Sequence, residues 1–442
     1  MALKEILRDA GIVGAGGAGF PTYAKLAKGA DTVLINAAEC EPLLFTDFTI
    51  LSRALETVCD GARLLADELQ SKDVLLCIKA HNAEELGYED GALLPYGVKL
   101  RALPDIYPLG DEITLIYEAT GRLVAPGCLP ITEGVVVSNT ETVYNLARAV
   151  REGKPLTEKW LTVGGDSPEP RVLRVPIGMP VSELLSKLNI KVPETHVVLD
   201  GGPAMGKVIK PATASVTKTT KGIVILPREI PAVQMKLRRP NQQATLAASA
   251  CCQCTNCTEM CPRALLGYPL EPHRLVRGAE DVVRAKPEAF TTAQLCCGCG
   301  ICEISACGQF ISPKAMISRQ KAILAEHKLR YTSDKKVTPS PDKDARRVPS
   351  SRWRSLLGVS RFHREAPYVG FVACDEVKLP MCMHIGAPAI PAVKIGDTVK
   401  EGDLIATAAD GLSLPHHAPI SGRVAYLDDN SIHILRDGFS AV

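Results

Sequence analysis

Two short stretches of the chain hold ten of its 16 cysteines, five in each, at spacings that suit the binding of metal centres. The first stretch, CCQCTNCTEMCP (251–262), fits the pattern C-x2-C-x2-C-x3-C-P. The second, CCGCGICEISAC (296–307), repeats the triple and places its last cysteine one residue later, before Gly308 instead of proline. Thiolates spaced this closely on one loop can hold several metal atoms at once.

This spacing predicts two [4Fe–4S] clusters with crossed ligand sets, because in two-cluster ferredoxins the fourth cysteine of such a run reaches the other cluster. Zinc is the alternative, since C-x2-C pairs also build tetrahedral zinc sites, but zinc needs only four ligands. Cys252 and Cys297 adjoin the first ligand of each run and are expected not to ligate. The two predicted ligand sets are Cys251, Cys254, Cys257 and Cys307 for one cluster, and Cys296, Cys299, Cys302 and Cys261 for the other.

A glycine-rich loop near the start of the chain, GIVGAGGAGFPTYAK (11–25), contains the letters of the dinucleotide fingerprint G-x-G-x-x-G. A standard fingerprint follows a strand and opens a helix. Here a helical pattern, LKEILRDAGI (3–12), precedes the glycines, and the strand-like run TVLINAAE (32–39) follows them. The local sequence therefore leaves two readings open: a phosphate-binding loop, or a glycine-rich surface turn.

Length and composition narrow the functional class. A chain of 442 residues is expected to form three or four domains. Its net charge is +2 and its aromatic content is 5%, which argues against nucleic acid as a partner. We expect no transmembrane segment and no signal peptide, and we place the protein in the cytoplasm, where thiols stay reduced.

The glycine loop resembles the FMN site of the flavoprotein subunit of respiratory complex I, whose pattern is G-x-G-G-A-G-F-P-T-x-x-K. Three further stretches are similar to that family in the same order: NAAECEP (36–42), YPLGDEITLI (107–116) and SNTETV (138–143). The family has aspartate where this chain has Ala38, which predicts one hydrogen bond fewer to the flavin.

The resemblance implies an FMN site and an adjoining NADH site. Lys25 would neutralise the FMN phosphate, while Asn36, Asn139 and Thr140 would bind the ribityl chain and ring edges. The residues that would line the nicotinamide side are Glu39, Asp111 and Glu112. The loop glycines that would hold the phosphate are Gly14, Gly16, Gly17 and Gly19.

Over nearly its whole length the chain resembles the RnfC family of the Rnf electron-transport complex and, more closely, the PduS-type cobalamin reductases of bacterial microcompartments. The predicted fold is multidomain α/β, and residues 384, 416 and 417 are histidines expected in solvent-facing turns rather than as cobalt ligands. The predicted domains are a Rossmann-like FMN/NADH domain (1–155), a soluble-ligand-binding (SLBB) β-grasp domain (156–232), a helical ferredoxin-like domain with two [4Fe–4S] clusters (240–330), a linker (331–364), and a lipoyl-like barrel-sandwich β domain (365–442).

The resemblance implies an NADH-dependent oxidoreductase that passes electrons through FMN and two clusters to cob(III)alamin. It also implies a place in or near a microcompartment, with a shell protein or an adenosyltransferase as partner. Two alternatives stay open. One is an Rnf-like protein exchanging electrons between NADH and ferredoxin or another protein acceptor, and the other is a non-enzymatic ferredoxin-like carrier or scaffold.

Overall fold

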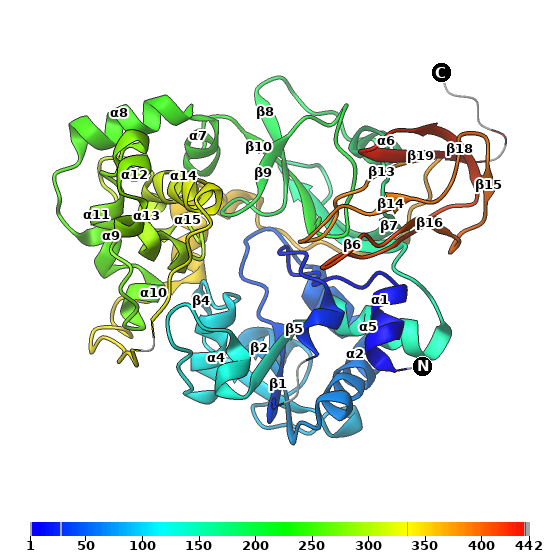
Figure 1. Ribbon diagram of the computed structural model, residues 1–442, viewed down its shortest axis with the longest axis horizontal. Coiled ribbons are helices and arrows are strands. Elements are labelled where there is room, and N and C mark those ends of the chain that lie inside the picture. Colours follow the sequence, from blue (N-terminus) through cyan, green and yellow to red (C-terminus); the bar gives the residue numbers. More distant parts are fainter. Residues whose placement is uncertain (1, 27–28, 334, 437, 439–442) are drawn as a thin grey trace.

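The computed structural model describes residues 2–26, 29–333, 335–436 and 438. Figure 1 shows an N-terminal α/β region at the bottom of the view, a mixed sheet above it, a helical region on the left and a β region on the right. The chain passes through these regions in that order. The multidomain α/β architecture expected from the sequence is present.

The N-terminal region is built on a parallel sheet in the order β3-β2-β1-β5, with helices on its faces. Strand β1 is almost continuously apolar, as expected of a strand covered on both faces. The glycine loop lies before β1, between helix α1 and the short 3-10 helix η1 (Thr22–Lys25), so it is not the usual strand-to-helix fingerprint. The elements are α1 (Leu3–Asp9), β1 (Thr32–Ala37), α2 (Thr46–Leu69), β2 (Asp73–Lys79), α3 (Ala80–Glu85), β3 (Lys99–Leu103), β4 (Ile106–Tyr107), α4 (Glu112–Thr120), β5 (Val135–Asn139) and α5 (Thr140–Glu152), with the 3-10 helices η2 (Pro95–Gly97) and η3 (Pro130–Glu133).

The second region is a six-stranded sheet in the order β12-β7-β6-β10-β8-β9. β6 pairs antiparallel with β7 and parallel with β10, and β10 continues antiparallel to β8. The edge strand β12 (Tyr368–Phe371) comes from much later in the chain. The other elements are β6 (Glu158–Gly165), β7 (Arg171–Pro176), α6 (Val181–Lys187), β8 (His196–Asp200), β9 (Lys207–Ile209) and β10 (Gly222–Pro227).

Short helices carry the two cysteine stretches. The longest is α14, and the others are one to three turns long because glycines and prolines interrupt them. The elements are α7 (Pro231–Leu237), α8 (Pro240–Ala250), α9 (Asn256–Glu259), α10 (Pro262–Leu265), α11 (Pro272–Leu275), α12 (Glu280–Ala285), the 3-10 helix η4 (Pro287–Leu295), α13 (Ile301–Ile304) and α14 (Pro313–Glu326).

The C-terminal region consists of two small antiparallel sheets, in the orders β13-β19-β18-β15 and β14-β16-β17. Its histidines do not all face solvent as expected: His384 and His416 are only 7% and 1% exposed, and His416 contacts the carbonyls of Pro415 and Met381. Packing between the two sheets accounts for their burial. The strands are β13 (Glu376–Pro380), β14 (Ile390–Pro391), β15 (Thr398–Val399), β16 (Leu404–Thr407), β17 (His416–His417), β18 (Gly422–Leu427) and β19 (Ser431–Arg436).

Residues 331–364, expected to form a solvated linker, are packed against the rest of the protein. They contain β11 (Val348–Pro349), which pairs with β4, the helix α15 (Ser350–Leu357) and the 3-10 helix η5 (Ser360–Phe362). Trp353 is fully buried and stacks on Tyr107 with ring centroids 4.4 Å apart. Lys343 and Arg347 both pair with the buried Glu118, so these cations serve an internal ion-pair network. A Pro- and charge-rich composition misled the sequence prediction because one tryptophan supplies the anchor.

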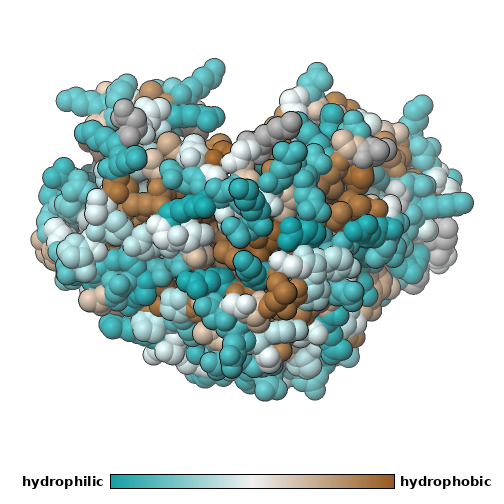
Figure 2. Space-filling model, turned by 90° about the horizontal axis from the view of Figure 1, so that it is seen from below, coloured by the Kyte–Doolittle hydropathy of each residue, from teal (hydrophilic) through white to brown (hydrophobic). Residues whose placement is uncertain are grey.

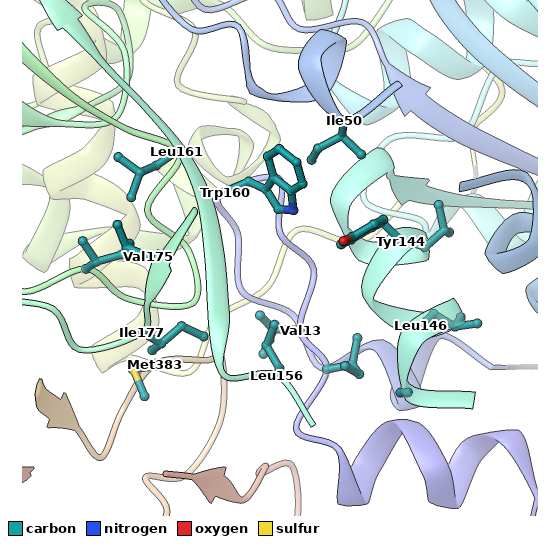
Figure 3. Packing of buried hydrophobic residues seen from close by; sticks show 14 of the residues in the cluster. Val13, Ile50, Tyr144, Leu146, Leu156, Trp160, Leu161, Val175, Ile177 and Met383 are labelled. Carbon is teal, nitrogen blue, oxygen red and sulfur yellow. The ribbon is translucent and has the colours of Figure 1, made fainter. Parts of the chain in front are cut away.

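A continuous apolar core joins the N-terminal region to the second and C-terminal regions (Figure 3). Trp160 of β6 meets Tyr144 of α5 edge to face, with centroids 5.9 Å apart. Val13 and Met383 join the same core from either end of the chain. Figure 2 shows a largely hydrophilic face interrupted by separate hydrophobic patches. No helix in the described part of the chain is long and apolar enough to cross a membrane.

Candidate functional site

A cavity of about 360 Å³ lies where the glycine loop meets the carboxyl ends of β1 and β5. We call it the glycine-loop cavity. Ala15 anchors the loop, because its amide donates to the Thr142 hydroxyl of α5 over 2.9 Å. The amides of Gly16, Gly17 and Ala18 have no acceptor among the described residues. Unpaired amides at a turn form a site for an anion such as a phosphate.

The four loop glycines have different positions. Gly14 and Gly16 line the cavity. Gly17 has φ 104° with open space where a Cβ would stand, so only its backbone faces solvent. Gly19 does not line the cavity: its amide donates to the Gly14 carbonyl, and a Cβ would meet Thr219 at 2.8 Å. The expectation that the Gly19 amide holds a phosphate is therefore wrong, because that amide closes the loop.

The polar residues expected at the flavin also divide. Lys25 lines the cavity and donates to the Val137 carbonyl over 3.0 Å. Asn36 and Asn139 line it too, with side-chain amides that donate to the Gly110 carbonyl and to Asp47 respectively. Thr140 does not: it is fully buried, and its hydroxyl donates to the Asn36 carbonyl over 3.1 Å. Thr140 supports the strand end instead of facing a ligand.

Of the three carboxylates expected at the nicotinamide side, all line the cavity but two are engaged by protein groups. Glu39 accepts the Thr46 and Asp47 amides at the start of α2. Asp111 caps α4 and accepts two hydrogen bonds from Arg263, which lies two residues after Cys261. Glu112 lies 3.4 Å from Lys25 and is 41% exposed, which leaves it the most accessible of the three.

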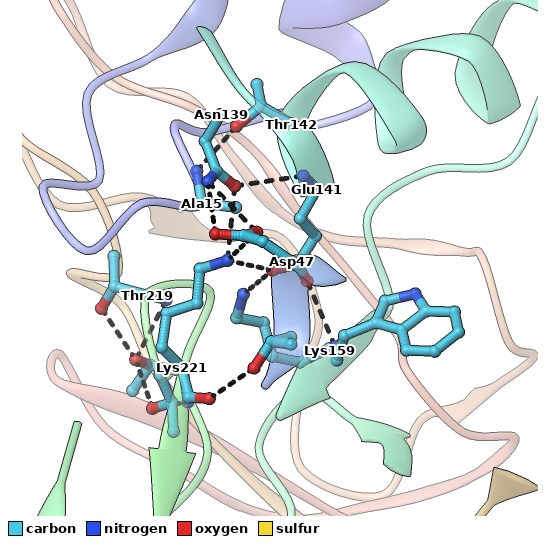
Figure 4. A network of polar contacts seen from close by, with 12 residues as sticks. Ala15, Asp47, Asn139, Glu141, Thr142, Lys159, Thr219 and Lys221 are labelled. Atoms are coloured by element: carbon cyan, nitrogen blue, oxygen red, sulfur yellow. Dashed lines mark hydrogen bonds and ion pairs between the residues drawn. The ribbon is translucent and has the colours of Figure 1, made fainter. Parts of the chain in front are cut away.

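A buried charge network beneath the cavity escaped sequence analysis (Figure 4). Lys221, at the start of β10, pairs with Asp47 over 2.6 Å and lies 3.7 Å from Glu141. Lys159 of β6 also pairs with Glu141, and both are essentially unexposed. Lys221 and Asp47 line the cavity, so the second region contributes a cation to it. No local motif marks Lys221, because 174 residues separate it from Asp47.

Replacing Gly17 by alanine is expected to weaken FMN retention about tenfold, because φ 104° strains an L residue by about 1–3 kcal/mol and disturbs the free amides. Flavin content after gel filtration measures the loss. Gly91→Ala is the matched control, since Gly91 also has positive φ and open space but lies away from the cavity. Equal FMN content in both variants would contradict this role of the loop.

The pH dependence of stability is expected to report on Glu39. Burial, and secondly the charge of Asp47, raise the pKa of Glu39 to about 7, against the opposing effect of Lys221. Between the ordinary value of 4.5 and about 7 the folded state then binds more protons than the unfolded state, so this group makes stability fall as pH rises.

Glu39→Gln removes this titration, and its thermal midpoint relative to the native protein should rise by about 3 °C or more between about pH 5 and about pH 8. Glu112→Gln, which removes a 41% exposed carboxylate of the same cavity, tests whether any glutamate there gives the same trend. A midpoint difference for Glu39→Gln that stays constant with pH would contradict the assignment.

A second cavity, of about 220 Å³, lies beside α9 and α11. We call it the outer cysteine cavity. The cysteines that line it include all four of one predicted ligand set: Cys251, Cys254, Cys257 and Cys307. Cys252 also lines it and is exposed. Cys307 arrives from the second cysteine stretch, in the way that the crossed assignment predicts.

A third, smaller cavity is lined by the other predicted set: Cys261, Cys296, Cys299 and Cys302. We call it the inner cysteine cavity. Cys297 and Cys299 line both this cavity and the glycine-loop cavity, so one turn of chain forms the wall between them. The Tyr107 hydroxyl fixes this wall by donating to the Cys299 carbonyl over 2.6 Å. Among the described residues, no three His, Cys, Asp or Glu side chains are arranged to hold a single metal ion.

The residues present fit the groups that the sequence pointed to. Free amides and Lys25 form a cradle for a phosphate, while four thiols surround each cysteine cavity. Backbone and side-chain amides also point at sulfur, since Gly298 donates to Cys296 and Gln253 to Cys251. Amide donors to thiolate sulfur are a general feature of iron–sulfur sites.

Family models match three parts of the chain. Residues 7–148 match the Nuo51 FMN-binding domain, residues 250–312 a 4Fe-4S dicluster domain, and residues 364–437 the RnfC barrel sandwich hybrid domain. The expected flavin domain, two-cluster domain and C-terminal barrel-sandwich domain are thereby confirmed, as are FMN and two [4Fe–4S] clusters as cofactors.

Curated relatives extend the similarity to the whole chain. The cobalamin reductase PduS of Salmonella typhimurium (strain LT2) is 36% identical over 98% of this chain and 96% of its own length. The protein of the same name from Citrobacter freundii is 37% identical with the same coverage. The RnfC-type component of the ion-translocating oxidoreductase complex of Klebsiella pneumoniae (strain 342) is 32% identical over 61% of this chain and 35% of its own.

Proposed function

The chain belongs to the PduS cobalamin reductase family, and from this premise we propose that it passes electrons from NADH, through FMN and two [4Fe–4S] clusters, to cob(III)alamin. It is an oxidoreductase and an iron–sulfur flavoprotein. Bound FMN supplies the step that accepts two electrons together and releases them singly to the clusters.

The observation that carries the proposal is the shared wall between the glycine-loop cavity and the inner cysteine cavity. Cys297 and Cys299 line both, so a flavin and a cluster bound there would be direct neighbours. The inner and outer cysteine cavities are in turn linked by the stretch from Cys257 to Cys261, which supplies one predicted ligand to each. This order supports a single path from flavin to inner cluster to outer cluster.

The protein's residues would bind and orient rather than act as acids or bases. The amides of Gly16 and Gly17, with Lys25, would hold the FMN phosphate. Lys221 would place a buried positive charge beside the ring, which favours reduced, negatively charged flavin. Glu112 would face the nicotinamide. The eight cysteines of the crossed sets would ligate the two clusters, four each.

We assign the second region to the SLBB β-grasp class, supported by its strand order β7-β6-β10-β8-β9 with β6 and β10 parallel. The domain limits proposed are those given above, except that β12 joins the second sheet. Membership of the PduS family further supports a place in the cytoplasm, inside or associated with a bacterial microcompartment. A shell protein or an adenosyltransferase would be its partner there.

Anaerobic turnover of the purified holoprotein with NADH and hydroxocobalamin tests the proposal. Since NADH carries two electrons and cob(III)alamin takes one to become cob(II)alamin, about two cobalamins should be reduced for each NADH oxidised. Ferredoxin serves as the competing acceptor. Reduction of ferredoxin with no reduction of cobalamin would reject the cobalamin assignment and favour the Rnf-like alternative.

A further inference from the structure

The outer cysteine cavity is where electrons can leave the protein. Cys252 and Cys254 on its rim are exposed, whereas the thiols of Cys261, Cys299 and Cys302 around the inner cavity are buried. The proposed function gives the path an entry at the glycine-loop cavity but does not say where the acceptor binds at the other end. The chemistry of this rim bears on that question.

The rim carries no formal charge. None of the described residues that line the outer cysteine cavity is Asp, Glu, Lys or Arg, although these types make up 23% of the chain. The glycine-loop cavity, by contrast, is lined by Lys25, Glu112 and Lys221 among other charged groups. Asn256 and Gln309 present exposed side-chain amides on the outer rim instead.

Phe310 stands on this rim at a cost to the fold. It lies between Gln309 and Ile311, its side chain is 61% exposed, and its backbone has φ 54°. Positive φ is unfavourable for a bulky residue, and an exposed ring adds nothing to the core. Arg238 holds the segment by donating to the Phe310 carbonyl. Strain and exposure at one residue, close to Cys307, point to binding.

We propose that Phe310 and the uncharged rim around it form the docking site of the electron acceptor, and that the acceptor is a corrinoid. A corrinoid ring is flat and largely apolar on its faces, and its edge carries carboxamide side chains. Phe310 would cover a face, while Asn256 and Gln309 would exchange hydrogen bonds with the carboxamides. A protein acceptor guided by charge would find no charged group among the described residues lining this cavity.

This inference rests on the proposed function, and its redox balance is simple. NADH gives up a hydride, which amounts to two electrons and one proton in excess of the NAD⁺ formed. Two cob(III)alamins each take one electron at the outer rim, so that each Co(III) becomes Co(II) and releases one axial ligand. The overall change is NADH plus two cob(III)alamin to NAD⁺, H⁺ and two cob(II)alamin.

Binding of hydroxocobalamin to the oxidised holoprotein tests the site without turnover. Phe310→Ala should weaken the dissociation constant, measured by equilibrium dialysis, about tenfold through the lost apolar contact. Phe310→Gly removes the ring and also relieves the positive φ, so it should show the same loss if the ring itself binds. Phe371→Ala is the matched control, because Phe371 is 44% exposed on β12, and its affinity should stay within about twofold.

The response to salt separates the corrinoid from a charged protein acceptor. Binding to an uncharged rim should change less than about twofold between about 50 mM and about 500 mM salt. Native-like binding by both Phe310 variants would overturn the site while leaving the proposed function intact. If the native protein is reduced by NADH yet binds no hydroxocobalamin, both the site and the cobalamin assignment are wrong.

Discussion

Replacing Cys261 by alanine is expected to lower NADH-driven cob(III)alamin reduction at least about 100-fold while FMN is still reduced by NADH. Cys261 belongs to the first cysteine stretch in sequence but lines the inner cavity with Cys296, Cys299 and Cys302. Its loss should remove the cluster that adjoins the flavin. The remaining outer cluster, measured by electron paramagnetic resonance, should then stay oxidised after NADH is added.

Cys307→Ala makes the complementary test of the crossed ligand sets. Cys307 belongs to the second stretch but lines the outer cavity, so its loss should spare the inner cluster and leave it reducible by NADH. Cys128→Ala, a half-buried cysteine outside both stretches, serves as the control with native behaviour. The crossed assignment is refuted if the two ligand variants exchange these phenotypes.

The second large effect is expected at the buried pair of Lys159 and Glu141. Lys159→Met should lower the free energy of unfolding by about 3–5 kcal/mol, because it leaves a buried carboxylate with less compensation. Glu141 also accepts the Trp160 amide and lies 3.7 Å from Lys221. The pair joins α5 of the flavin domain to β6 of the second region. Thermal unfolding of the holoprotein measures the change.

A matched substitution separates burial from charge. Lys187 pairs with Glu183 and Asp375 but is 33% exposed, and Lys187→Met should cost less than about 1 kcal/mol. Adding Glu141→Gln to Lys159→Met should recover part of the lost stability, since the unpaired charge is then gone. Similar losses for the Lys159 and Lys187 variants would contradict a special role for the buried pair.

The cysteine cavities were predictable because their chemistry is local in sequence. Three thiolates within seven residues identify a cluster loop, and a fourth cysteine that cannot share the loop implies exchange with the partner stretch. The glycine loop was predictable for a similar reason: the FMN pattern spans twelve contiguous positions from Gly14 to Lys25. Its place before β1, which departs from the usual fingerprint, also followed from the order of helical and strand-like patterns.

Contacts between distant segments were not predictable. Lys221 reaches the glycine-loop cavity from the second region, and nothing in its local sequence marks it. Gly19 matches the loop pattern, yet its amide closes the loop on Gly14. Thr140 offers a hydroxyl in the right segment, but burial turns that hydroxyl to Asn36. Composition alone made residues 331–364 a linker, whereas Trp353 fixes them to Tyr107.

The central claim is one electron path from NADH through FMN to two clusters, and an anaerobic NADH titration of the native holoprotein tests it most directly. Iron, acid-labile sulfide and flavin are counted first, and flavin absorbance and cluster paramagnetic resonance are then followed as NADH is added. The account predicts about eight irons and one FMN per chain, with flavin and both clusters reduced. Zinc in place of iron, or a flavin that NADH reduces without either cluster responding, would contradict it.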